Sequence, residues 1–303
     1  MDLLNNTNVQ IDILREYTEC ISDVVFKMYY NWRRTHNNND ISEADAIAQC
    51  ILQIMHCKIK SFLKLSEGIA VVPNNESCII LDVPSLTTIV RSMYELTFIF
   101  HNIYAEQKSE AEKEIILYLW EIRGLNNRQG LSNIPAEYKG KEEKEKAQIE
   151  ELRGKIKNIT KDLNTSNEIK RQIEGVLKNN STKIKGYRFV KDNNDRIISF
   201  EDIRMEDYAG QLLCIDENLD VYRFCSIHTH PSYLGILQFG QMYNSNADKQ
   251  FLKTLAMTVC KLSCTIIKDF TDNIKGAHEI FQNLSESEKG MINLFIIKQG
   301  NNN

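Results

Sequence analysis

The chain has 303 residues, of which 42% are hydrophobic and 26% are charged, as in an ordinary globular protein. Its formal net charge of −4 excludes a basic field over the whole molecule, so a nucleic-acid partner would need a local basic patch. The N-terminus lacks a basic region followed by an apolar run, no stretch is long and uncharged enough for a membrane span, and the eight cysteines form no C-x-x-C pair. We therefore expect a cytoplasmic protein with reduced thiols and no membrane contact.

Helices are predicted along most of the chain. Only four prolines and thirteen glycines interrupt it, and the apolar residues recur at steps of three and four, which is typical of an all-α protein. The first helices are expected at residues 9–34, 42–68, 84–104 and 109–124, with an extended segment at 69–81. The sequence thus predicts a multi-helix bundle, and residues 1–135 are expected to form its N-terminal part.

The third of these helices carries two charges on an otherwise apolar surface. Arg91 and Glu95 are four residues apart, so their side chains lie on one face of the helix. Two explanations are open. The two residues form a structural ion pair that fixes the register of the helix, or they line the same cleft as the motif at residues 222–232.

Residues 136–180 differ in composition from the rest of the chain. Lys, Glu, Gln and Asn dominate, and the few apolar residues recur at steps of three, four and seven, which predicts a narrow hydrophobic seam. We expect a charged helical hairpin, or arm, broken around residues 164–167. Its charges form a solvated face, a contact with another protein chain, or a surface that contacts RNA.

The last part of the chain, residues 181–303, is expected to complete the bundle and to carry the main motif. A short strand pair is predicted at 187–190 and 196–198, followed by helices at 207–219 and 248–270 and by one or two more between 274 and 298.

The main motif is a helical stretch that ends near Pro231. Tyr222, Ser226 and His230 are spaced by four residues, and Arg223 falls on the same stripe, whereas His228 points elsewhere. A histidine at a helix C-terminus is favoured in its cationic form by the helix dipole, which raises its pKa. The stripe therefore predicts a site for acid catalysis near neutral pH. The alternative is that these side chains form a closed structural network.

Two short patterns connect this sequence to known families. Arg223 is followed after four residues by His228 and after six by His230, which is similar to the R-x4-6-H signature of the HEPN superfamily of helical ribonucleases. The chain also resembles domain-of-unknown-function family 5677, a HEPN-like family of helical bacterial proteins. The segments that carry this resemblance are Arg91 to Glu95, and Tyr222 to Ser226 followed by the His-Pro-Ser triplet at 230–232.

The resemblance implies a metal-independent endoribonuclease of bacterial defence or stress response, acting as a homodimer without a cofactor. His230, or else His228, would move protons to and from the ribose 2′-hydroxyl and the leaving 5′-oxygen. Arg223 would hold the scissile phosphate. Tyr222 and Ser226 would bind the phosphate or orient the imidazole, and Arg91 and Glu95 would position Arg223 from the facing helix.

Two other classes of function remain open. His228-Thr229-His230-Pro231 is similar to the His-x-His-Pro core of the JAMM zinc peptidases, but the serine and the aspartate that this site also needs downstream are missing. The other class is a non-catalytic binding or regulatory module, such as a toxin–antitoxin or phage-defence partner. In that case Arg223 and His230 should be buried in a hydrogen-bonded network, whereas a catalytic site should leave them open to solvent.

Overall fold

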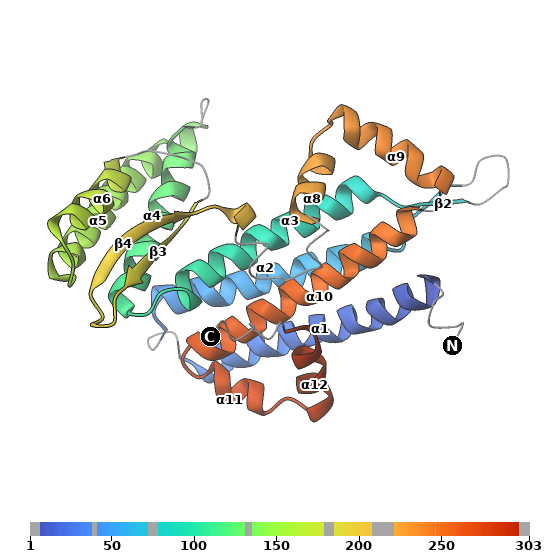
Figure 1. Ribbon diagram of the computed structural model, residues 1–303, viewed down its shortest axis with the longest axis horizontal. Coiled ribbons are helices and arrows are strands. Elements are labelled where there is room, and N and C mark those ends of the chain that lie inside the picture. The colour runs from blue at the N-terminus through green and yellow to red at the C-terminus, as the bar shows by residue number, and fades with distance from the viewer. Residues whose placement is uncertain are drawn as a thin grey trace. The chain divides into compact units, whose positions relative to one another are not determined.

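The computed structural model describes residues 7–37, 41–71, 78–130, 135–178, 185–207, 221–245 and 247–296, and helices dominate these ranges. The strands that it contains form two small two-stranded antiparallel sheets. The prediction of an all-α, multi-helix protein is therefore confirmed. The chain divides into two compact units, one made of residues 1–100 and 206–303 and the other of residues 101–205 (Figure 1).

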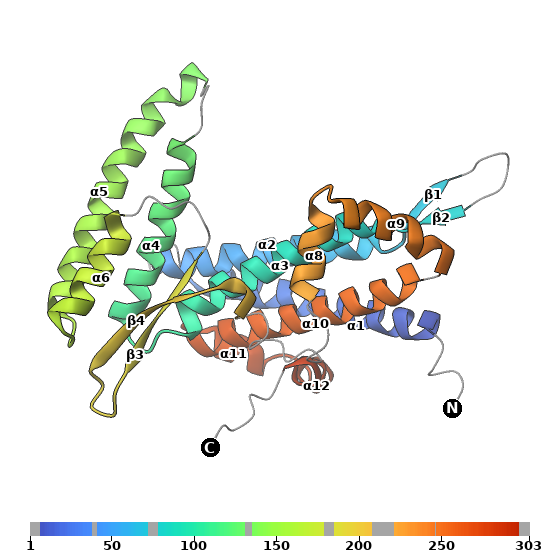
Figure 2. The same cartoon turned by 45° about the horizontal axis from the view of Figure 1, so that its top comes forward.

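The first unit is a helical bundle in which the N-terminal part of the sequence supplies three long helices and the C-terminal part supplies one. Its elements are α1 (Thr7–Thr35), α2 (Glu43–Leu65), β1 (Ile69–Val71), β2 (Cys78–Ile80), α3 (Val83–Phe100), α8 (Val221–Thr229), α9 (Tyr233–Ser245), α10 (Ala247–Asn273), α11 (Ala277–Gln282) and α12 (Glu286–Phe295). Helix α10 packs against α1 and α3, and α2 packs against the same two helices (Figures 1 and 2).

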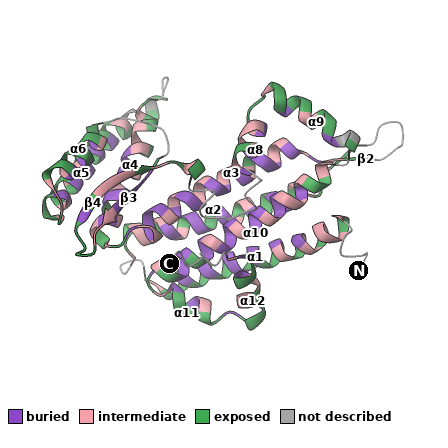
Figure 3. Cartoon of the chain, viewed as in Figure 1, coloured by how far each residue is buried: buried purple, intermediate pink, exposed green. Residues whose placement is uncertain are grey.

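The core of this bundle is built from the apolar stripes that the periodicity indicates. Trp32, Phe100 and Phe270 are almost fully buried, and their rings meet where α1, α3 and α10 come together. Figure 3 shows the buried residues on the inward faces of these helices and the exposed residues on the outer faces. Burial of apolar side chains contributes about 1.5–3 kcal/mol for each large residue, so this contact is a main source of stability for the bundle.

Although the sequence predicts no membrane span, helix α10 is long and apolar enough to cross a membrane by length and composition alone. In the bundle, however, 61% of its most apolar window is buried by the surrounding helices. A core helix of a globular protein has this same pattern, so the length and composition of α10 are accounted for by its packing.

The second unit contains the charged hairpin together with the elements that pack on it. Its elements are a π-helical turn, η4 (His101–Ala105), and then α4 (Glu110–Gln129), η5 (Ala136–Tyr138), α5 (Lys139–Asp162), α6 (Asn167–Lys178), β3 (Gly186–Lys191) and β4 (Ile197–Ile203). Helix α5 packs against α4, α6 packs against α5, and β4 packs against α6. The predicted hairpin with its break near residues 164–167 and the predicted strand pair are both present.

The boundaries of this unit are wider than the 136–180 arm expected from composition. Helix α4 and the β3–β4 hairpin belong to it, because buried polar groups tie them to one another. The side-chain amides of Asn102 and Gln107 both donate to the carbonyl of Tyr187, and the buried carboxylate of Glu112 pairs with Lys191 at 2.9 Å. These contacts join residues far apart in the sequence, which composition does not reveal.

Other differences from the predicted elements are local. The predicted extended segment at 69–81 contains β1 and β2, and helix α4 continues to Gln129 rather than ending near residue 124. Most of the predicted helix at 207–219 lies outside the described residues.

Candidate active site around Arg91

The motif at residues 222–232 lies at a junction of two helices. Helix α8 ends at Thr229, His230 follows it, and α9 begins at Tyr233, so the expected helix end before Pro231 is present. Ser232 caps α9, because its hydroxyl accepts a hydrogen bond from the amide of Gly235 at 3.0 Å. A side chain at Gly235 would come within 3.0 Å of the carbonyl of Ile227, so the glycine permits the close approach of α9 to α8.

Helix α8 packs along α3, and this contact brings the two sequence motifs together (Figures 1 and 2). The guanidinium of Arg91 lies 3.3 Å from Nε2 of His230 and 3.2 Å from Oε1 of Glu95. Its central carbon lies 5.9 Å from the centre of the Tyr222 ring. Arg91, Glu95, Tyr222 and His230 therefore form one group of side chains, which we call the Arg91 cluster.

The Arg91 cluster is open to solvent. His230 is exposed, and the side chains of Arg91 and Glu95 retain 24% and 28% of their accessible surface. The cluster is thus not the closed, buried network that was the structural alternative. Both the guanidinium and the imidazole therefore remain accessible to solvent.

The contact with Arg91 orients the imidazole of His230. A guanidinium only donates, so Nε2 faces the cation as the acceptor. An imidazole nitrogen can move a proton to or from a bound hydroxyl, so His230 stands where an acid-base group is needed beside an anion-binding group.

Tyr222 adds a neutral hydroxyl to the cluster. Burial and the nearby Glu95 carboxylate raise its pKa, with Arg91 acting in the opposite direction, so the phenol stays protonated at neutral pH. Its ring is held by an edge-to-face contact with Tyr94, with ring centres 5.7 Å apart. Tyr222 can thus donate a hydrogen bond but cannot act as a base near pH 7.

The other residues of the predicted stripe are placed differently. Arg223 is exposed on α8, and Arg91 from the facing helix contacts His230. The hydroxyl of Ser226 donates to the carbonyl of Tyr222 at 2.9 Å, a bond within its own helix. Cys225 is buried behind the stripe, and burial raises the pKa of its thiol to about 12, so it is not a nucleophile.

His228 lies on the buried side of α8, away from the predicted stripe. It is 5% exposed, its Nε2 lies 3.1 Å from Oε1 of Gln238, and its ring packs on Phe224. Burial lowers the pKa of His228, and the hydrogen bond with Gln238 opposes this effect. His228 and His230 thus have separate partners, and the described residues contain no group of three His, Cys, Asp or Glu side chains that could bind a metal.

We expect the burial of His228 to make the protein less stable in mild acid. The pKa of His228 is lower in the folded chain than its ordinary value of 6.5, which applies to the unfolded chain. The free energy of unfolding is therefore highest above about pH 6.5 and decreases as the pH drops toward the folded pKa. Unfolding midpoints measured between pH 7.5 and 5.5 should fall more steeply for the wild type than for His228→Asn. The exposed His278 provides the control, because His278→Asn should keep the wild-type slope. Equal slopes for wild type and His228→Asn would contradict this account.

Helix α9, next to the Arg91 cluster, was not predicted and has an unusual surface. It contains no charged residue, and Tyr233, Leu234, Ile236 and Leu237 are between 41% and 79% exposed. An apolar patch on a protein surface commonly marks a contact with another molecule. The serine that caps α9 and the apolar run that follows were the signals in the sequence that could have identified it.

Comparisons with known proteins do not extend this description. No family model matches the chain, and no curated protein and no solved structure is significantly similar to it. The function is therefore inferred from the site itself.

Proposed function

We propose that the protein is a HEPN-like, metal-independent endoribonuclease, acting in bacterial defence or stress response, and that the Arg91 cluster is its active site. The observation that supports this most is the contact between Arg91 and Nε2 of His230 on an accessible surface. This pairing combines a planar donor for a phosphate with an imidazole that can move protons, the two functions that RNA cleavage by the 2′-hydroxyl needs.

In the proposed reaction, the scissile phosphate binds to the guanidinium of Arg91 and displaces the imidazole from it. Nε2 of His230 then accepts the proton of the ribose 2′-hydroxyl, whose oxygen attacks phosphorus. The bond from phosphorus to the 5′-oxygen breaks, and the imidazolium returns the proton to that oxygen. The products are a 2′,3′-cyclic phosphate and a 5′-hydroxyl, so atoms and protons balance without another reactant.

The remaining members of the cluster support these two residues. Glu95 pairs with Arg91 and restrains its side chain, while the neutral phenol of Tyr222 can donate to a phosphate oxygen. In this proposal Arg91 takes the phosphate-binding role that the sequence pattern gave to Arg223. Arg223 then lies outside the reacting group.

The purified protein should cleave RNA in the presence of EDTA. The expected products end in a 2′,3′-cyclic phosphate and a 5′-hydroxyl, which mass spectrometry of a defined oligonucleotide distinguishes from 3′-hydroxyl and 5′-phosphate ends. Activity that disappears on chelation and returns with a divalent cation would contradict the proposed mechanism.

A second candidate is a non-catalytic binding module that pairs with another copy of itself. The exposed apolar face of α9 favours it, because an uncharged helix that carries four exposed large apolar residues suits a contact between identical chains. The same preparation distinguishes the two candidates. A protein that leaves RNA intact and sediments as a dimer is better described as the binding module, whereas a homodimer that cleaves RNA fits the ribonuclease.

A further inference from the structure

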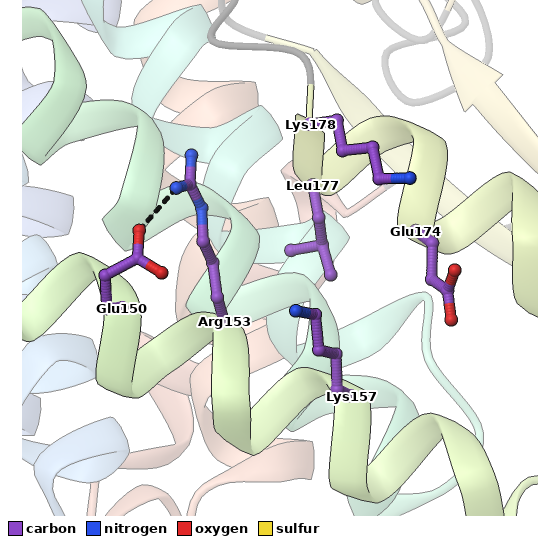
Figure 4. Close-up of a pocket in the computed structure, with 6 residues that line it drawn as sticks. All are labelled: Glu150, Arg153, Lys157, Glu174, Leu177 and Lys178. Carbon is purple, nitrogen blue, oxygen red and sulfur yellow. Dashed lines mark hydrogen bonds and ion pairs between the residues drawn. The ribbon is translucent and has the colours of Figure 1, made fainter.

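A hollow of about 620 Å³ lies between α5 and α6, within the second unit. Its lining residues come from one face of each helix: Glu150, Arg153 and Lys157 from α5, and Glu174, Leu177 and Lys178 from α6 (Figure 4). This volume is in the range of pockets that hold small ligands or segments of larger ones. No role has been assigned to this hollow by the sequence or by the Arg91 cluster.

The charges around the hollow are not equivalent. Arg153 is paired with Glu150 at 2.6 Å. Lys157, Lys178 and Glu174 take part in none of the ion pairs found among the described residues. Figure 4 shows the ammonium groups of Lys157 and Lys178 on opposite sides of the buried Leu177, and the carboxylate of Glu174 at one end. Two cations are thus available to a ligand, next to an apolar surface and one acceptor.

The hairpin that forms the hollow is basic in an acidic protein. Residues 139–178 contain eleven basic and eight acidic residues, although the whole chain has a net charge of −4. A local basic segment of this kind is what a protein of acidic composition needs in order to bind a polyanion.

We propose that this hollow binds a segment of single-stranded RNA. Lys157 and Lys178 contact two phosphates of the strand, Leu177 packs against a base or sugar, and Glu174 accepts a hydrogen bond from a ribose 2′-hydroxyl. Cations separated by an apolar side chain suit the repeating phosphates of a strand better than a single phosphate. The carboxylate of Glu174 repels the phosphates of the strand unless the ligand also donates a hydrogen bond to it. The ribose 2′-hydroxyl is such a donor, and RNA has this group whereas DNA does not.

The choice of RNA deepens the proposed ribonuclease function, but its test does not depend on catalysis. Binding is measured by fluorescence anisotropy with the full chain carrying His230→Ala, so that the RNA stays intact. The ligands are a single-stranded RNA oligonucleotide, the DNA of the same sequence, and AMP. The variants are Lys157→Gln with Lys178→Gln, and Glu174→Ala. Lys144→Gln, which changes an exposed lysine of α5 outside the hollow, is the matched control.

We expect the double lysine variant to bind RNA about tenfold more weakly and to lower the slope of log K against log salt by about 1.4, since each phosphate contact on a single strand contributes about 0.7. Lys144→Gln should change neither quantity. Glu174→Ala should reduce the preference for RNA over DNA without a similar loss of affinity for DNA. The proposal would be overturned if the double variant and the control bind RNA equally well, or if the chain with His230→Ala alone binds AMP as tightly as the RNA strand. It would also be overturned if that chain binds no RNA.

Discussion

Replacement of His230 by alanine should reduce RNA cleavage at least about 100-fold while the protein stays folded. General acid-base catalysis contributes about 10²- to 10⁴-fold to such a reaction, and His230 is the one imidazole in the Arg91 cluster. Because His230 is exposed and lies outside the ends of α8 and α9, its removal leaves no buried cavity. The thermal unfolding midpoint should therefore remain close to that of the wild type.

The control for this experiment is another histidine in a similar setting. His278 is exposed and lies on the short helix α11, where its ring contacts Gln282. His278→Ala should cleave RNA at the wild-type rate. If both variants lose activity to the same extent, or if His230→Ala retains full activity, His230 is not the acid-base group.

The helices of the fold could be predicted because their signals are local. Apolar residues at steps of three and four place α1, α2, α3 and α10, and the polar residues near 164–167 locate the break between α5 and α6. The extent of the second unit could not be predicted. It depends on contacts such as those of Asn102 and Gln107 with Tyr187, which join positions about eighty residues apart and leave no periodic trace.

The candidate site could be predicted in part for the same reason. Helical spacing predicted that Tyr222 and His230 share one stripe and that His228 points away from it. In the structure Tyr222 and His230 both lie beside Arg91, and His228 is buried. Which arginine reaches His230 depends on how α3 and α8 cross, and crossing angles are not encoded in the period of either helix. The sequence pattern favoured Arg223, which is near in the chain, whereas the contact is made by Arg91, which is 139 residues away.

The position of Arg91 also explains the pair of charges in an apolar helix. Arg91 and Glu95 are only partly buried, so the pair contributes little to stability compared with a fully buried pair. The explanation as an ion pair and the explanation as part of the site are therefore compatible. Glu95 restrains Arg91, and Arg91 remains accessible to His230 or to an anion.

The central claim is therefore that Arg91, and not Arg223, holds the phosphate next to His230. Its most direct test compares the rates of RNA cleavage in EDTA by Arg91→Gln and Arg223→Gln, with unfolding midpoints measured on the same samples. Arg91→Lys is included because it keeps the charge but loses the planar fork of donors. We predict a loss of about 100-fold or more for Arg91→Gln, an intermediate rate for Arg91→Lys and a nearly wild-type rate for Arg223→Gln. Full activity in a folded Arg91→Gln, with activity lost in Arg223→Gln, would contradict the account.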